Sequence, residues 1–115
     1  MDDVEEALRQ FRGEFVRASR ERVGEMESLL DRLRGAPADA QLLQALERHF
    51  HGLVGAGGTY GFARMSELAA QGELDCKRVQ EAQAAAAPAE IDRWKGLVAE
   101  IRASLDGWTP EASGG

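Results

Sequence analysis

The sequence predicts an all-α protein, an antiparallel up-and-down four-helix bundle with a short extra helix at the N-terminus. Three observations support this prediction. Apolar residues recur at steps of three and four along most of the chain, which is the period of an amphipathic helix. The 115 residues include only three prolines and are rich in the helix formers Ala, Leu, Glu and Arg. No segment alternates strictly between apolar and polar residues, so we expect no sheet.

The first apolar stripe runs from Val4 to about Leu33. Its members are Val4, Leu8, Phe11, Phe15, Val23, Met26, Leu30 and Leu33. Gly13 interrupts the stripe, and a glycine inside a helix costs about 1 kcal/mol relative to alanine. We therefore expect a short first helix and a longer second one. Gly35 is a natural C-terminal cap, and Pro37 cannot extend the helix.

Three further helices follow from the same periodicity. One is expected to begin at Asp39 and to end in a turn formed by residues 57–61, the next covers about 62–82, and the last covers about 89–105. The alanine-rich stretch 83–88 contains a proline and is expected to be a loop. These elements predict one domain over residues 1–106, followed by a flexible tail or linker over residues 107–115 with Gly, Ser, Thr and Pro.

The composition, 43% hydrophobic and 30% charged, is that of a soluble globular protein and excludes several functions. The net charge is −6, and the arginines of the first helix alternate with glutamates, so no basic face is available for nucleic acid. No apolar run approaches the roughly 20 residues of a membrane span, and the acidic start is unlike a signal peptide. The single Cys76 cannot form an intrachain disulfide and suits a reducing compartment. We expect a cytoplasmic location and no membrane partner.

The segment 48–62 is the most informative part of the chain, because four glycines at positions 52, 55, 57 and 58 follow closely on a histidine. Two interpretations fit this spacing. Either the helix ends early and His51 is merely solvated, or the glycines are retained to keep the His51 ring accessible. In the helical register of Phe50 and Leu53, His51 lies on an outward face with Gly55 one turn later.

The chemistry of imidazole favours a nucleophilic role for an exposed histidine. Its unperturbed pKa near 6.5 keeps the neutral form populated near pH 7, and this form is a good nucleophile toward phosphorus. His49 lies two residues before His51 and about 200° around the helix, so the pair cannot chelate a metal from one helix. With one cysteine and no histidine cluster, we expect no metal site.

This segment resembles the histidine phosphotransfer (Hpt) domain family. The family motif is a histidine, a lysine that often follows three residues later, a glycine at the fourth position, small residues and a final glycine. His51, Gly55, Gly58 and Gly61 match it. The resemblance to the phosphotransfer domain of chemotaxis-type histidine kinases continues to Glu73, which stands at the family's interval of twenty-two residues after the histidine.

The resemblance implies a role for each of these residues. His51 would accept a phosphoryl group on Nε2, and Glu73 would accept a hydrogen bond from Nδ1–H and so orient the ring. Gly55 would leave space beside the phosphoryl group, and Gly58 and Gly61 would permit close packing and the turn into the next helix. An exposed helix carboxylate remains the alternative for Glu73.

One position departs from the family motif. Val54 stands where the lysine is usual, which removes a cation expected beside the phosphoryl group. Arg48, one turn before His51, is a candidate for charge support, and a solvated arginine is the alternative.

The resemblance predicts a phosphocarrier of a two-component or phosphorelay system, which passes a phosphoryl group between a histidine kinase and a receiver-domain aspartate. The chain has no Gly-rich ATP-binding motif, so it would not be an independent kinase. It would need no cofactor of its own, with Mg²⁺ in the partner's active site. A narrower version makes it the first domain of a chemotaxis-type kinase. The alternative is a non-catalytic docking module for a receiver or kinase, which the valine at position 54 favours.

Overall fold

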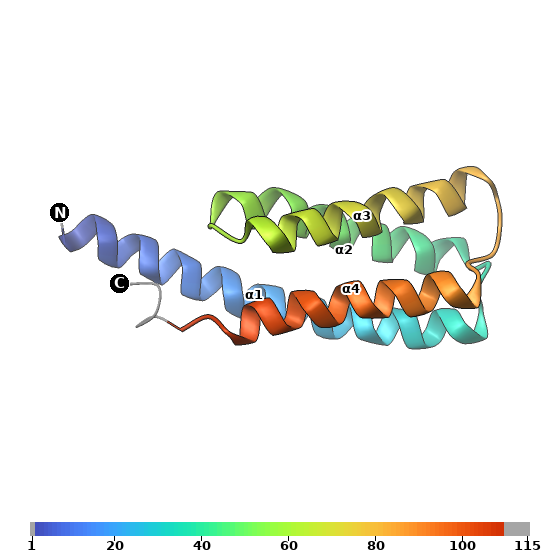
Figure 1. Cartoon of the computed structure of the whole chain (residues 1–115), viewed down its shortest axis with the longest axis horizontal. Coiled ribbons are helices and arrows are strands. Elements are labelled where there is room, and N and C mark those ends of the chain that lie inside the picture. The colour runs from blue at the N-terminus through green and yellow to red at the C-terminus, as the bar shows by residue number, and fades with distance from the viewer. Residues whose placement is uncertain (1, 110–115) are drawn as a thin grey trace.

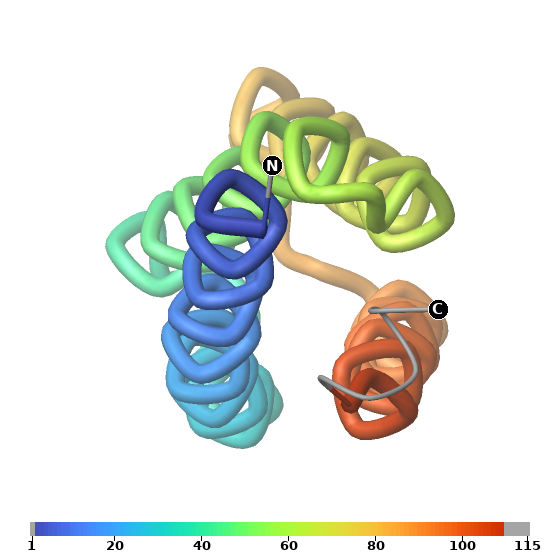
Figure 2. The backbone as a smooth tube through the Cα atoms, turned by 90° about the vertical axis from the view of Figure 1, so that its left-hand side faces the viewer, coloured from blue at the N-terminus to red at the C-terminus, as the bar shows by residue number. Residues whose placement is uncertain are grey.

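The computed structural model describes residues 2–109, and in this range it contains four helices and no strand. They are α1 (Asp2–Gly35), α2 (Ala40–Thr59), α3 (Ala63–Glu81) and α4 (Pro88–Asp106). Consecutive helices run antiparallel and form an elongated bundle about 52 Å long (Figure 1). Each helix packs against two neighbours in the cyclic order α1, α2, α3, α4 (Figure 2). The predicted all-α four-helix bundle is confirmed.

The predicted short N-terminal helix is wrong, because α1 is a single helix of 34 residues that passes through Gly13 without a break. One glycine costs only about 1 kcal/mol in a helix, and packing on both sides of Gly13 offsets that cost. Phe15 stacks on Tyr60, with ring centroids 4.9 Å apart. The ring of Trp108 lies beside Gly13, so that a Cβ there would be 3.7 Å from the indole.

The N-terminal end of α1 projects beyond the other helices (Figure 1). As a result, Val4, Leu8 and Phe11, the first members of the apolar stripe, are 63%, 47% and 52% exposed. Of the later members, Phe15 is half-buried and burial is complete from Val23 onward, whereas the buried Val16 lies outside the predicted stripe. Hydrophobic periodicity therefore predicted the helix and its apolar face correctly, but not where the bundle that covers this face begins.

The core is one continuous apolar cluster with members from all four helices. Its largest fully buried side chains are Trp94, Phe50, Met26, Leu30, Leu33, Leu43, Leu46, Leu53, Met65, Ile101, Leu105 and Val16. Each of the last three helices buries an apolar face in this core, and the face of α3 includes Cys76, whose thiol pKa is raised by burial. Trp108 was expected in the tail, yet it is half-buried against the core. The rest of the predicted tail, residues 110–115, lies outside the described range.

Short, well-bonded connections join the helices. Asp39 caps α2 because its Oδ1 accepts hydrogen bonds from the backbone N–H groups of Gln41 and Leu42, at 2.9 and 3.2 Å. At the same end of the bundle, the Ala86 N–H donates to the Pro37 carbonyl at 2.8 Å, which ties the α3–α4 loop to the α1–α2 loop. These contacts fix the end of the hairpin from which α2 extends.

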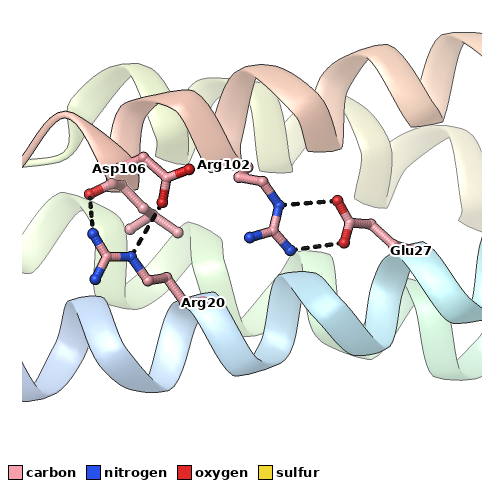
Figure 3. Close-up of polar contacts among 5 residues, drawn as sticks. Arg20, Glu27, Arg102 and Asp106 are labelled. Atoms are coloured by element: carbon pink, nitrogen blue, oxygen red, sulfur yellow. Dashed lines mark hydrogen bonds and ion pairs between the residues drawn. The ribbon is translucent and has the colours of Figure 1, made fainter.

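Ion pairs connect α1 to α4 along one side of the bundle (Figure 3). Arg102 donates two hydrogen bonds to the Glu27 carboxylate, at 3.0 and 2.7 Å, and this pairing raises the Arg102 pKa. Arg20 donates to the Asp106 carboxylate and to the Leu105 carbonyl, both at 3.2 Å. These polar bonds lie on the α1–α4 side of the molecule, and α2 and α3 form the opposite side (Figure 2).

The turn predicted over residues 57–61 begins later than expected, because α2 continues to Thr59 and the connection to α3 consists of Tyr60, Gly61 and Phe62. Gly61 has a φ of +87°, which the absence of a side chain allows without strain. Contacts with α3 hold this end of α2 in place. The Ser66 hydroxyl, for example, donates to the Val54 carbonyl at 2.7 Å.

Candidate functional site

His51 lies on the outward surface of α2, and its side chain is 74% exposed. Its neighbour Phe50 is fully buried, so the same helix that anchors itself in the core presents the imidazole to solvent. The outward face predicted from the periodicity is therefore present. The helix does not end before the glycines, and His51 is held on a regular helical scaffold.

Glu73 of α3 contacts the His51 ring directly. The distance from His51 Nδ1 to Glu73 Oε2 is 2.6 Å, and the Glu73 side chain is only 14% exposed. An ionised carboxylate can only accept hydrogen bonds, so in the neutral ring the hydrogen is on Nδ1. Nε2 then carries the free lone pair. The two residues are brought together as the twenty-two-residue interval predicts, with Nε2 on the side of the ring away from the carboxylate.

A glycine on α3 sets the register of this contact. Gly72 packs against the Phe50 ring, and a Cβ at Gly72 would overlap the ring carbons. Phe50 and Gly72 immediately precede His51 and Glu73, so both pairs are separated by twenty-two residues. The ring of Phe50 fills the space that Gly72 leaves open, and this buried fit places the two polar side chains opposite each other one residue later.

The other glycines of the segment have different surroundings. A Cβ at Gly57 would lie 3.1 Å from Met65 Cε and 3.3 Å from the Phe62 carbonyl oxygen, so α2 and α3 approach closely there. A Cβ at Gly55 or at Gly58 would meet no atom within 4 Å. Close packing therefore depends on Gly57 and Gly72, and the expectation that Gly58 permits it is wrong. Gly55, one turn after His51, faces open space.

Lys77 is a member of this site that the sequence analysis missed. Its Nζ lies 3.4 Å from Glu73 Oε2, the same oxygen that contacts His51. Lys77 follows Glu73 by one helical turn, and the i,i+4 spacing of glutamate and lysine was the signal that could have identified it. Such pairs are common on helix surfaces, so the spacing alone did not single out this one.

The two positions that the sequence singled out for charge are less directly connected to the site. Val54 is half-buried and packs against the core, so it offers no polar group to the surface near His51. Arg48 is exposed and has no hydrogen bond or ion pair within residues 2–109. The structure does not bring it into contact with His51 or Glu73.

His49 faces the other side of α2 and contacts α1. Its Nδ1 accepts a hydrogen bond from Arg22 at 3.0 Å, and its Nε2 lies 3.1 Å from Glu25 Oε2. Burial lowers the His49 pKa, the charge of Arg22 lowers it further, and Glu25 partly opposes both effects. Gly52 leaves room for the Arg22 guanidinium, because a Cβ there would lie 2.8 Å from it. This histidine has both nitrogens engaged.

The described part of the chain contains no cluster of three or more histidine, cysteine, aspartate or glutamate side chains that could hold a metal ion. Within residues 2–109, no helix is long and apolar enough to cross a membrane. The candidate site is therefore an exposed imidazole, a largely buried carboxylate and an ammonium group.

One comparison with known protein families gives a match. The model of the Hpt domain family matches residues 10–104, which cover most of the chain and include all the site residues named above. Comparisons with curated proteins and with solved structures give no significant match. Hpt domains carry phosphoryl groups on histidine in phosphorelays. Because the family model spans most of its length, this chain belongs to the Hpt domain family.

Proposed function

We propose that His51 is the phosphoryl acceptor of this Hpt domain and that it passes the phosphoryl group between a histidine kinase and the aspartate of a receiver domain. The observation that carries the proposal is the contact of 2.6 Å between His51 Nδ1 and Glu73 Oε2. It keeps the ring hydrogen on Nδ1 and leaves Nε2 as an exposed nucleophile. His49 is unsuited to this role because both its nitrogens are engaged by α1.

In the proposed reaction, the lone pair of His51 Nε2 forms a bond to phosphorus as the bond between phosphorus and the donor oxygen breaks. The electron pair leaves with that oxygen, which belongs to ADP in a kinase or to the aspartate carboxylate in a receiver. The hydrogen stays on Nδ1, where Glu73 accepts its hydrogen bond and stabilises the positive charge that the ring acquires. Transfer to a receiver aspartate is the reverse displacement with a new oxygen.

The partner supplies the rest of the chemistry. No Gly-rich nucleotide motif occurs in the chain, and Mg²⁺ is expected in the active site of the kinase or receiver. The open space at Gly55 supports close approach of such a partner, because no side chain there stands between it and the imidazole. A chemotaxis-type kinase is the proposed donor, on the strength of the glutamate at the family's interval. A panel of purified kinases would identify the donor by its labelling rate.

The two histidines of the chain provide a matched test. The wild-type domain, H51Q and H49Q would be incubated with a phosphorylated receiver or with kinase and labelled ATP, and the acid-labile label would be counted. Labelling is expected in the wild type and H49Q and not in H51Q. Equal labelling of H51Q would contradict the proposal. A stoichiometric complex with the receiver and no label on any variant would instead support the docking module.

A further inference from the structure

The phosphorylated form of the site has a charge imbalance that position 54 does not correct. A phosphoryl group on His51 brings up to two negative charges to a surface where Glu73 already carries one. Val54 contributes no charge. Within residues 2–109, Lys77 is the one cation that contacts the pair formed by His51 and Glu73. Any compensation from this chain must therefore come from Lys77 or from an unpaired side chain such as Arg48.

The position of Lys77 suits this task. Its side chain is 49% exposed, so the ammonium group is in contact with solvent on the same surface as the imidazole. It lies on the Nδ1 side of the ring, where the shared Glu73 oxygen is 3.4 Å from Nζ and 2.6 Å from Nδ1, so the ammonium must move along the edge of the ring to reach a phosphoryl group on Nε2. The flexible four-carbon stem of a lysine allows the ammonium to change partners while the backbone stays fixed.

We propose that Lys77 exchanges partners when His51 is phosphorylated. In the free domain it pairs with Glu73, and in the phosphorylated domain its ammonium donates to an oxygen of the phosphoryl group on Nε2. Lys77 thus supplies from α3 the cation that the usual lysine would supply from position 54 of α2. This inference rests on the proposed function of His51 and specifies how the same site manages its charge.

The exchange follows from the relative charges. A phosphoryl group with two negative charges attracts an ammonium more strongly than a single carboxylate does, and hydrogen bonds to ionised oxygens are the stronger class. Lys77 acts only as a hydrogen-bond donor. It forms no bond to phosphorus and transfers no proton. When the Lys77 ammonium leaves Glu73, the Glu73 oxygen accepts a hydrogen bond from the His51 Nδ1–H alone. The carboxylate is then available to the ring at the stage at which the ring is positively charged.

The test uses the whole chain and a small phosphoryl donor, so that no partner protein is required. Wild type, K77Q, K77R, R48Q and K95Q would be phosphorylated with phosphoramidate and followed by ³¹P NMR as the pH is changed. Lys95 is a matched control because it is the only other lysine of the chain, and it pairs with Asp31 on the α1–α4 side. Circular dichroism would establish that each variant is folded.

A cation near the phosphoryl group lowers the pH at which that group takes up a proton. In K77Q this pH is expected to rise by about half a unit to one unit, since a nearby opposite charge shifts a pKa by about that amount or more. Labelling by the anionic donor is expected to slow by about five- to tenfold. K77R should retain most of the wild-type behaviour, and R48Q and K95Q should match the wild type. The double variant K77Q/V54K should recover part of both effects.

Each result has a definite meaning. A phosphoryl titration in K77Q identical to the wild type would overturn the role of Lys77 and leave that of His51 intact. A shift in R48Q and none in K77Q would assign the compensation to Arg48 and likewise overturn the proposal. Failure of the wild type to become labelled at His51 would contradict the proposed function itself. Different observations would therefore contradict the role of Lys77 and the proposed function of His51.

Discussion

The two histidines of α2 are two residues apart and have opposite surroundings. The His49 side chain is 20% exposed and is bonded at both nitrogens by side chains of α1. The His51 side chain is 74% exposed and is bonded at one nitrogen by α3. A helix turns about 200° between these positions, so one face of α2 packs against α1 and the other carries the candidate site. The comparison shows that one free nitrogen, rather than histidine as such, defines the candidate site.

The largest effect is expected when the single partner of His51 is removed. In E73A the ring loses its orienting carboxylate, and labelling is expected to slow by about tenfold to a hundredfold, the range found when the partners that orient metal-bound histidines are removed. E73Q should slow labelling less, because its amide oxygen can still accept from Nδ1–H.

Initial rates with one phosphorylated receiver would measure this effect, and the matched change on the other histidine is E25Q. That substitution removes the carboxylate partner of His49 and should leave the rate nearly unchanged. If E25Q slowed labelling as much as E73A, the division of α2 into a packing face and a chemical face would be wrong.

The second effect concerns the buried fit that places Glu73 beside His51. G72A adds a methyl group where the Phe50 ring lies, so the variant is expected to lose about 1–3 kcal/mol of unfolding free energy and to label more slowly. Thermal and urea unfolding would measure the loss. G24A is the control, since a Cβ there meets nothing within 4 Å and the substitution should stabilise α1 by about 0.5–1 kcal/mol. Equal stability of both variants would show that Gly72 does not set this contact.

The smallest effect concerns the pH dependence that His49 introduces. Because burial and Arg22 lower its pKa, the unfolded chain takes up a proton near pH 6.5 whereas the folded protein does so only at lower pH. The unfolded state therefore binds more protons in this range, and stability due to His49 is present above pH 6.5 and is lost as the pH falls below it. The Tm of the wild type should fall more than that of H49Q between pH 7 and pH 5. A parallel decrease in H49Q and the wild type would contradict this assignment.

Much of the fold could be predicted from the sequence, for identifiable reasons. The helices and their inner faces follow from apolar periodicity, and Asp39 marks the start of α2 because its side chain can cap a helix. The length of α1 could not be predicted, because the contacts that offset the helical cost of Gly13 involve residues far away in the sequence. Trp108 lies beside Gly13, and Tyr60 stacks on the nearby Phe15. The end of α2 was predicted two or three residues too early, because the contacts with α3 that hold it also involve residues distant in the sequence.

The candidate site was predictable only in part. The pairing of His51 with Glu73 depended on a family resemblance, because twenty-two residues of spacing has no local physical meaning until two helices are packed together. The role of Gly72 was hidden, since only the packed structure reveals the Phe50 ring against it. Lys77 was hidden for a different reason, because its partner Glu73 is an ordinary helix neighbour and becomes distinctive only through the second contact with His51.

The central claim is that Glu73 holds the hydrogen on His51 Nδ1 and so directs the phosphoryl group to Nε2. The most direct test is a ¹⁵N–³¹P correlation spectrum of the phosphorylated domain with ¹⁵N-labelled histidine. We expect phosphorus to couple to Nε2 of His51, Nδ1 of the same ring to retain its hydrogen, and His49 to show no coupling. Coupling of phosphorus to His51 Nδ1, or to either nitrogen of His49, would contradict it.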